Sequence, residues 1–218
     1  MSGILYGVGL GPGDPELMTV KSSRLISDAK VIAYPSLAGG KSFARAIAAD
    51  LISPQAEEIV MDVPMTVERA PAQAAYDIGA KSIAAALDRG DDVICLCEGD
   101  PFFYGSFMYL YARLATNYQV EVVPGVTSIT ACAARAGMPL AARNERLTVL
   151  PGPLPAEELR ARIEGAESVV IMKVGRHFPK IRAVIEQLGL TGQANYIERA
   201  SLPDELVCPL AEAPEKAP

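Results

Sequence analysis

The chain has 218 residues, of which 50% are apolar, and its formal net charge is -6. A chain of this length and composition can bury a substantial core, in one large domain or two small ones, which excludes general disorder. The acidic balance argues against a broad face for polyanions, so we expect no nucleic-acid partner. A membrane-spanning helix needs a run of about 18 apolar residues. The sequence has none, and we expect no membrane partner and a location in the cytoplasm.

The cysteine and histidine content argues against a metal site. The four cysteines are Cys95, Cys97, Cys132 and Cys208, no CxxC pair occurs, and there is one histidine, His177. Structural zinc sites need four such ligands at short spacings, so we expect no metal. Cys95 and Cys97 are two residues apart in an apolar run, which would place both side chains on one face of a strand.

Short apolar runs alternate with helical patterns along the first half of the chain. A first strand is predicted at 3–9, and the helix after it begins near Asp14 or Thr19, both good N-caps. The continuous apolar run DVICLC, 92–97, is typical of a strand buried on both faces. The other elements expected here are strands at 31–34, 57–61 and 119–123 and helices at 41–50, 71–89, 103–114 and 125–136.

Strands and helices alternate again beyond a junction at 137–145. The expected elements are strands at 146–150, 168–174 and 194–198 and helices at 156–164 and 177–188. Such alternation predicts an α/β fold whose sheets are parallel or mixed and carry helices on their faces. We predict two α/β domains, 1–138 and 139–218.

The stretch GVGLGPGDPE, residues 7–16, first suggests a dinucleotide-binding loop. That fingerprint needs G-x-G-x-x-G, with backbone N–H groups facing a pyrophosphate. In the three possible registers the third glycine is replaced by Pro12, Asp14 or Glu16, and proline has no N–H to donate. The second strand also lacks the acidic residue that would bind a ribose. A nicotinamide-dependent reductase is therefore disfavoured, and a plain strand-to-helix turn is the alternative.

A second loop, EGDP at 98–101, follows the buried strand at 92–97. In open α/β sheets, ligands bind beyond the carboxyl ends of the strands, so this loop lies where a site is expected. The carboxylates of Glu98 and Asp100 would repel phosphates but suit a cation or ribose hydroxyls. Gly99 allows a close approach of the backbone.

The helix predicted after this loop is unusually aromatic. Its apolar stripe at helical spacing would pack in the core and consists of Phe103, Phe107, Leu110 and Leu114. Four further aromatic residues lie off this stripe: Phe102, Tyr104, Tyr109 and Tyr111. A large flat ligand or a subunit interface would explain them.

A third stretch, PGVTSITACAARAGMPL at 124–140, joins a strand end to a helix whose cap is Thr127 or Ser128. A helix N-terminus offers unpaired N–H groups and the positive end of the helix dipole, which suit a carboxylate. The small residues of this helix also allow close packing on a sheet. Taken by itself, this stretch fits a packing helix equally well.

Together and in this order, the three stretches and a later fourth string resemble the tetrapyrrole (corrin and porphyrin) methylase family. The matching strings are VGLGPGDPELMTVKS (8–22), EGDPFFYGS (98–106), PGVTSITACAARAGMPL (124–140) and VIMKVGR (170–176). The likeness runs over nearly the whole chain. Within the family, EGDPFFYGSFMYLY, VIMKVGRH and YIERASLPDE most resemble the members that methylate precorrin-2 at C20. Members usually run on past the KAP at which this sequence stops, into a final strand.

The resemblance implies two α/β domains that form a trough, with S-adenosylmethionine held between them, in a homodimer. The reaction would move the sulfonium methyl group to C20 of precorrin-2, which gives precorrin-3A in cobalamin biosynthesis and leaves S-adenosylhomocysteine. The residues that the resemblance implies for cofactor binding are Pro12, Glu98, Gly99, Asp100, Phe103, Tyr104, Thr127, Ser128, Met172 and Ala217.

The chemistry of this methyl donor agrees with the loops. S-adenosylmethionine carries a sulfonium, an ammonium and a carboxylate but no phosphate, and its methyl group is already activated, so the reaction needs no protein nucleophile or metal. Asp100 and Tyr104 are possible acceptors of the proton lost from C20. His177 is another, although a histidine in this context is more often a helix-start residue.

Precorrin-2 carries carboxylate side chains, so basic residues are expected to face it. The candidates are Arg143, Arg146, Lys173 and Arg176. Two alternatives stay open. The substrate could be the cobalt-containing analogue, cobalt-factor II, or another corrin intermediate. The protein could instead be a non-enzymatic module that holds a tetrapyrrole on its aromatic helix.

Overall fold

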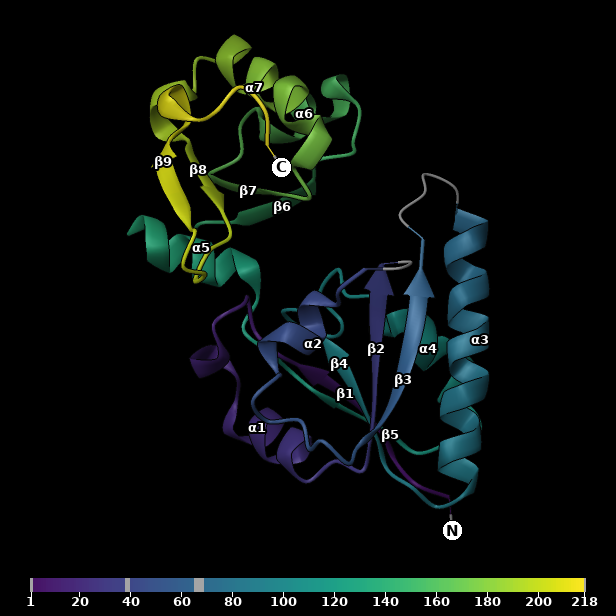
Figure 1. Ribbon diagram of the computed structural model, residues 1–218. Helices are drawn as coiled ribbons and strands as arrows, with labels where there is room; N and C mark the ends of the chain where they lie inside the picture. Colours follow the sequence, from purple (N-terminus) through teal and green to yellow (C-terminus); the bar gives the residue numbers. More distant parts are fainter. Residues whose placement is uncertain (1, 38–39, 65–68, 218) are drawn as a thin grey trace. The chain divides into compact units, whose positions relative to one another are not determined.

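A computed structural model of the chain describes residues 2–37, 40–64 and 69–217 (Figure 1). The chain forms two compact units, Met1–Thr127 and Ser128–Pro218. Our prediction places the helix at 125–136 in the first domain, whereas in the structure this helix, α5 (Ser128–Ala136), contacts strands of the second unit. Within the described ranges, no helix is both long and apolar enough to cross a membrane.

The first unit is built on one five-stranded parallel sheet in the order β3-β2-β4-β1-β5. Its strands are β1 (Leu5–Gly9), β2 (Val31–Leu37), β3 (Glu57–Val63), β4 (Val93–Cys97) and β5 (Val120–Val123). Its helices are α1 (Val20–Ser27), α2 (Phe43–Ile47), α3 (Arg69–Asp88) and α4 (Phe107–Leu114). Since each strand returns through a helical crossover, the sheet is parallel throughout, as the strand–helix alternation predicts.

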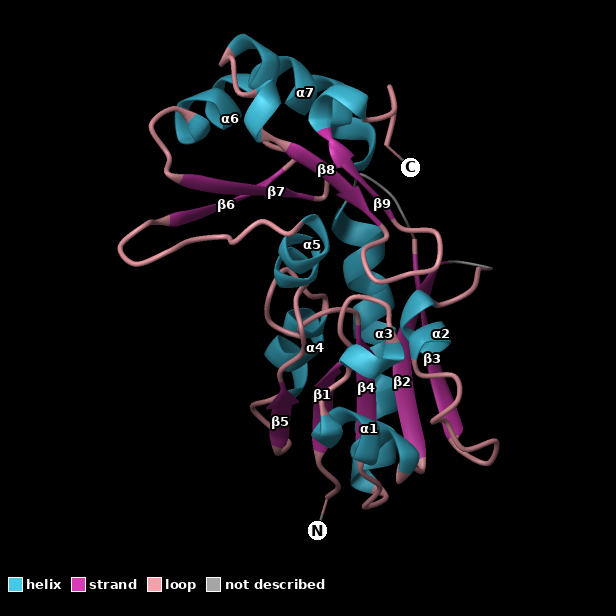
Figure 2. Ribbon diagram, turned by 90° about the vertical axis from the view of Figure 1, so that its left-hand side faces the viewer, coloured by secondary structure: helices cyan, strands magenta, loops and turns pink. Residues whose placement is uncertain are grey.

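Helices cover both faces of this sheet, α1 and α2 on one side and α3 and α4 on the other (Figures 1 and 2). Successive strand residues point to opposite faces. On β4, Ile94 and Leu96 join the core under α1 and α2, whereas Cys95 and Cys97 join the core under α3 and α4. All of β4 is buried, which confirms the prediction from DVICLC, and the two cysteines share one face as free thiols.

Caps explain where the first helical segments begin. Both predicted N-caps are used: Asp14 accepts from Glu16 N–H at the start of a short 3-10 turn, and Thr19 accepts from Ser22 N–H at the start of α1. The sequence predicts one helix that begins near Asp14 or Thr19. The structure has two segments there, a 3-10 turn that starts with Pro15 after Asp14 and then α1 after Thr19.

Two helices begin later than predicted. The helix expected at 103–114 begins at Phe107, because the chain before it turns through Tyr104, whose φ is 55°. The helix expected at 125–136 begins at Ser128. The strand expected at 168–174 ends at Met172, since Lys173 also has a left-handed φ, 56°. Left-handed residues cannot continue a helix or a strand.

The second unit has a parallel pair, β6 (Leu147–Pro151) with β7 (Ser168–Met172), and an antiparallel pair, β8 (Asn195–Glu198) with β9 (Leu206–Pro209). Its longer helices, besides α5, are α6 (Ala156–Ile163) and α7 (Phe178–Gln187). The sequence analysis does not predict β9, a four-residue strand that ends in proline. Parallel and antiparallel pairs together make this the mixed α/β unit that we expect.

Candidate active site

Three loops meet at the carboxyl edge of the first sheet. Because β1 lies between β4 and β5 in the sheet, the loops after these three strands are neighbours. Gly11 and Gly99 exchange backbone hydrogen bonds, Gly11 N–H to Gly99 O at 3.2 Å and Gly99 N–H to Gly11 O at 2.8 Å. The glycine-rich loop after β1 is thus bound to the EGDP loop after β4.

Where these loops touch, backbone atoms occupy the space that a side chain would need at the glycine positions. A Cβ on Gly125 would lie 2.1 Å from the carbonyl oxygen of Gly99, and a Cβ on Gly9 would lie 2.6 Å from the backbone nitrogen of Gly125. No side chain fits at such distances. The glycines therefore serve the mutual packing of the three loops, a role that the sequence analysis did not assign to Gly9 or Gly125.

Asp100 binds two of the three loops together. One oxygen of its carboxylate accepts the backbone N–H groups of Phe102, at 2.9 Å, and Phe103, at 3.0 Å. The other oxygen accepts Gly125 N–H at 3.0 Å. Both oxygens are therefore engaged by backbone donors, and the geometry is that of a residue that holds the loops in position. The first two bonds form the Asx turn that an aspartate before two aromatics can make.

The other predicted residues of these loops differ in exposure. Pro12 and Phe103 are half-buried, whereas Glu98 and Tyr104 are exposed. The rings of Phe103 and Tyr104 meet edge to face, with centroids 5.2 Å apart. Desolvation by the surrounding protein raises the pKa of the Glu98 carboxyl, although more than a third of the residue contacts solvent. Glu98 thus offers an accessible carboxyl group at the end of β4.

The PGVT segment connects this edge of the sheet to the start of α5. Thr127 is the last residue of the first unit, and Ser128 is the exposed first residue of the nine-residue helix α5. The first N–H groups of a helix have no partner within the helix, and they lie at the positive end of its dipole. The N–H groups at the start of α5, which suit an anion, therefore follow Gly125 closely in the sequence.

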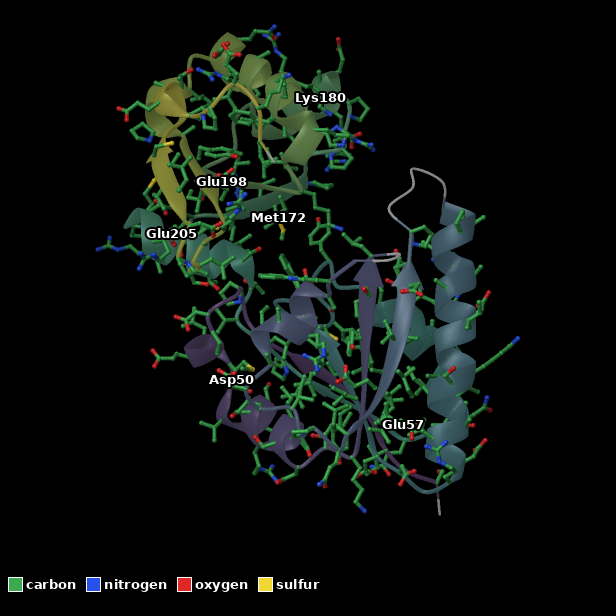
Figure 3. All side chains as sticks on the ribbon, in the orientation of Figure 1. Asp50, Glu57, Met172, Lys180, Glu198 and Glu205 are labelled. Carbon is green, nitrogen blue, oxygen red and sulfur yellow. The ribbon has the colours of Figure 1, made fainter. Side chains whose placement is uncertain are left out.

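Two of the predicted cofactor-binding residues, Met172 and Ala217, belong to the second unit. Met172 is half-buried at the end of β7, directly before Lys173 (Figure 3). Ala217 instead packs against the cluster that contains Phe178 and Tyr196.

Three of the four predicted substrate cations lie at the surface of the second unit. Arg143, Lys173 and Arg176 are exposed, and Arg143 and Lys173 have left-handed φ angles of 50° and 56°. Arg146 is also exposed, but its Nε lies 3.1 Å from a carboxylate oxygen of Glu167, which also accepts the Arg146 backbone N–H. Arg146 therefore has a structural role at the start of β6.

Two polar contacts of the second unit were not anticipated from the sequence. Lys180 on α7 donates its ammonium to the carbonyl oxygens of Gly152, at 2.9 Å, and Leu154, after β6 (Figure 3). Glu205 binds Arg135 of α5 with both carboxylate oxygens, at 2.7 and 2.9 Å from Nε. Neither contact has a local sequence signal, because each joins segments far apart in the chain.

His177 stands at the N-cap position of α7, in agreement with the helix-start interpretation. Its pKa is lowered by desolvation first, and then by the positive charges of Lys180 and Arg176. Among the described residues, no group of three or more histidine, cysteine or acidic side chains could hold a metal ion.

Comparison with known proteins agrees with these observations. The profile of the family "Tetrapyrrole (Corrin/Porphyrin) Methylases" matches residues 4–214. A precorrin-2 C(20)-methyltransferase of Sinorhizobium sp is 42% identical, over 100% of this chain and 94% of its own length. A cobalt-precorrin-2 C(20)-methyltransferase of Salmonella typhimurium is 34% identical, over 94% of this chain and 87% of its own length.

A solved structure shares the fold. The uroporphyrin-III C-methyl transferase of Thermus thermophilus, in complex with S-adenosylhomocysteine, superposes with a TM-score of 0.68 at 28% identity. The match covers 96% of this chain and 85% of that one. The α/β fold, the three joined loops and the match along almost the entire sequence lead to one conclusion: this chain belongs to the tetrapyrrole (corrin/porphyrin) methylase family, and it is a methyltransferase.

Proposed function

We propose that the protein transfers the methyl group of S-adenosylmethionine to C20 of precorrin-2, forming precorrin-3A in cobalamin biosynthesis. The observation that carries this proposal is the assembly of three loops at the carboxyl edge of β4, β1 and β5, held by Asp100 and by glycine contacts. The 42% identity to a protein named for this activity supports the substrate.

The residues at this edge fit the charges of S-adenosylmethionine. The donor carries an ammonium and hydroxyl groups, which suit the accessible carboxyl of Glu98, and a carboxylate, which suits the start of α5 at Thr127 and Ser128. It carries no phosphate, and the loop after β1 has Pro12 where a pyrophosphate site needs a backbone N–H. The set of groups therefore favours this donor over a dinucleotide.

The residues that the family resemblance implies for the donor belong to both units. In the first unit they are Pro12, Glu98, Gly99, Phe103, Tyr104 and Thr127, with Asp100 holding the loops in place. In the second unit they are Ser128, Met172 and Ala217. The proposed partners of the substrate carboxylates are Arg143, Arg146, Lys173 and Arg176. Arg143 and Lys173 lie in left-handed conformations, which cluster at functional sites.

Catalysis would come mainly from positioning. Bound S-adenosylmethionine supplies a methyl group that is already activated, so the protein's task is to align C20 with that group. Holding two reactants in line can lower the barrier by about 7–11 kcal/mol. A rigid set of loops, cross-linked by backbone hydrogen bonds and one carboxylate, suits this task.

The proton lost from C20 needs an acceptor, for which the sequence suggests Asp100 or Tyr104. Both oxygens of Asp100 already accept backbone N–H groups, so we propose it as a positioning residue. Tyr104 is exposed at the end of the same loop. A change from Tyr104 to Phe tests its part by removing the hydroxyl while keeping the ring.

We further propose that the substrate is free of metal, because identity is higher to the precorrin-2 enzyme, 42%, than to the cobalt-precorrin-2 enzyme, 34%. The protein would act in the cytoplasm as a homodimer. These proposals follow the family resemblance together with the absence of a membrane-spanning helix from the described part of the chain.

The deciding experiment is incubation with S-adenosylmethionine and precorrin-2, followed by mass spectrometry. We expect a product heavier by one methyl group, with the new methyl at C20. A parallel reaction with cobalt-factor II tests whether the protein prefers the metal-free substrate. Tetrapyrrole binding without a gain in mass would favour a non-enzymatic binding module. If calorimetry detects binding of NADH but none of S-adenosylmethionine, the reductase hypothesis would be favoured instead.

A further inference from the structure

A turn of the second unit leaves the end of β6 and lies against the end of β7. It has the sequence PGPL, residues 151–154, and we call it the PGPL turn. Pro151 pairs with Met172 in the register of the two strands, and the N–H of Gly152 donates to the Met172 carbonyl oxygen at 2.7 Å. Ligands of α/β sheets bind beyond the carboxyl ends of the strands. The PGPL turn therefore borders Met172 and Lys173, the residues proposed to contact the donor and the substrate.

The PGPL turn packs directly on the backbone of these two residues. Gly152 is buried, and a Cβ at this position would lie 2.7 Å from the carbonyl oxygen of Lys173 and 3.2 Å from that of Met172. Cδ1 of Ile181, a core residue of α7, would lie 3.0 Å from the same Cβ. Lys173 has a left-handed φ of 56°, which a residue with a side chain keeps only where its surroundings hold it. A shift of the turn would therefore remove support from the end of β7.

The PGPL turn has few N–H groups of its own. Pro151 and Pro153 have none to donate, and the N–H of Leu154 donates back to the Pro151 carbonyl oxygen at 3.2 Å. The carbonyl oxygens of Gly152, at 2.9 Å, and of Leu154 accept from the ammonium group of Lys180. Hydrogen bonds from a charged donor are stronger than neutral ones. One ammonium group thus binds the turn to α7 at two points.

Local criteria disfavour a lysine at position 180. Lys180 is the third residue of α7, at the positive end of the helix dipole, whereas cations are favourable near the other end of a helix. Arg176 and His177 directly precede the helix, and desolvation first, then the charges of Lys180 and Arg176, lower the pKa of His177. Residues that break a local rule are expected at functional sites. The two carbonyl oxygens of the PGPL turn give Lys180 a reason to stand there.

We propose that Lys180 is a positioning residue of the methyl-donor site. Its ammonium group holds the PGPL turn, and the turn fixes the backbone of Met172 and Lys173. Lys180 thus does in the second unit what Asp100 does in the first, where one charged side chain binds the backbone of loops that follow the strands. The inference rests on the proposed function, because it takes Met172 as a neighbour of the donor and Lys173 as a partner of the substrate.

The first test is calorimetry of the full chain and its variants with S-adenosylhomocysteine, the product of the proposed reaction. Lys180→Met keeps the apolar stem of the side chain and removes the ammonium group. We expect this variant to bind about tenfold more weakly, because the ligand must then order the turn as it binds. Lys180→Arg keeps a charged donor with several N–H groups, so it should retain most of the affinity.

Arg162→Met is the matched control for the change in charge. Arg162 lies on α6 of the same unit, and it pairs with Glu158 where both side chains are well exposed. This variant removes one positive charge from the second unit without touching the PGPL turn, so its affinity for S-adenosylhomocysteine should equal that of the unchanged chain. Circular dichroism checks that each variant is folded.

The second test needs no ligand. In Lys180→Met, hydrogen exchange of the Gly152 N–H, which donates to Met172, should accelerate more than exchange of amides in the middle of the β6–β7 pair. Equal acceleration would overturn the inference.

Two results in calorimetry would also contradict it: normal affinity in folded Lys180→Met, or affinity in Lys180→Arg as weak as in Lys180→Met. If the unchanged chain binds no S-adenosylhomocysteine, the proposed function fails, and the link from Lys180 to the donor fails with it. Exchange at Gly152 then still decides whether Lys180 holds the turn, so the two failures are distinguishable.

Discussion

The carboxylate of Asp100 accepts the backbone N–H of Gly125 at 3.0 Å, across a separation of 25 residues in the chain. This bond joins the loop after β4 to the loop after β5. With its second oxygen, the same carboxylate holds the N–H groups of Phe102 and Phe103. One side chain thus holds two of the three loops of the candidate site in place. A substitution of Asp100 should therefore alter the positions of both loops.

Asp100→Ala should weaken the binding of S-adenosylmethionine and lower the free energy of unfolding by about 2–4 kcal/mol, because three backbone donors lose a charged acceptor. Asp100→Asn should lie between, since the amide oxygen can still accept from Phe102 and Phe103 but the amide nitrogen cannot accept from Gly125. Calorimetry with the methyl donor and urea denaturation measure the two effects. If the alanine variant binds S-adenosylmethionine as tightly as the unchanged chain does, Asp100 does not contribute to the donor site.

Gly125→Ala should prevent the close contact of the three loops. The added Cβ would lie 2.1 Å from the Gly99 carbonyl oxygen, so the backbone must move, at a cost of about 1–3 kcal/mol or more. Gly192→Ala is the control, because a Cβ there meets no atom within 4 Å. Thermal unfolding of both variants checks the prediction. Equal melting temperatures would show that the loops can part without cost.

The Glu58 carboxylate should give the fold a measurable dependence on acid pH. Arg45 binds it with two nitrogens, at 2.7 and 2.8 Å, and the Tyr34 hydroxyl donates to it. The hydrogen bonds to Arg45, the largest cause, lower the pKa of Glu58 from 4.5 to about 2. A depressed pKa in the folded state stabilises the fold fully above pH 4.5, and this contribution disappears as the pH falls through about 2.

Glu58→Gln should therefore lower the free energy of unfolding by about 1–2 kcal/mol at neutral pH, a figure reduced for solvent screening of a partly exposed pair. The difference from the unchanged chain should vanish near pH 2. Glu57→Gln is the control on the same strand, since its pair with Arg89 is about half exposed on both sides. Urea denaturation at several pH values tests this, and a difference that persists at pH 2 would contradict the assignment.

The pair of Glu205 and Arg135 should hold α5 to the segment before β9 (Figure 3). Glu205 also accepts the backbone N–H of Ser201 at 2.7 Å. Its pKa is lowered, first by the hydrogen bond from Arg135 and then by that from Ser201. Glu205→Gln should speed the amide hydrogen exchange of α5 and of Ser201, and acid pH should do the same to the unchanged chain.

Glu158→Gln is the matched comparison for this change. Glu158 pairs with Arg162 four residues along α6, with both side chains well exposed, and such pairs contribute little to stability. Its loss should leave exchange in α5 unchanged. If α5 exchanges at the same rate in both variants, the Glu205 pair does not anchor the helix.

Local chemistry accounts for the elements that the sequence analysis predicts correctly. The apolar run of β4, the N-caps Asp14 and Thr19 and the alternation of short strands with helices depend on neighbours within a few residues. Tyr109 and Tyr111 lie off the apolar stripe of α4 and are exposed, as helical spacing indicates, whereas Phe107 lies on the stripe and is buried. The family strings also indicate a methyltransferase, and the charges of the loops agree with a donor that carries no phosphate.

Other features depend on contacts between distant segments, which no local pattern encodes. The hydrogen bond from Gly125 to Asp100, the place of Ala217 in the Phe178 cluster and the assignment of α5 to the second unit became visible only in three dimensions. A residue's type determines which bonds it can make and which backbone angles it tolerates. Which partner it meets is decided by the packing of the whole chain, because a distant N–H competes with nearby ones for the same carboxylate.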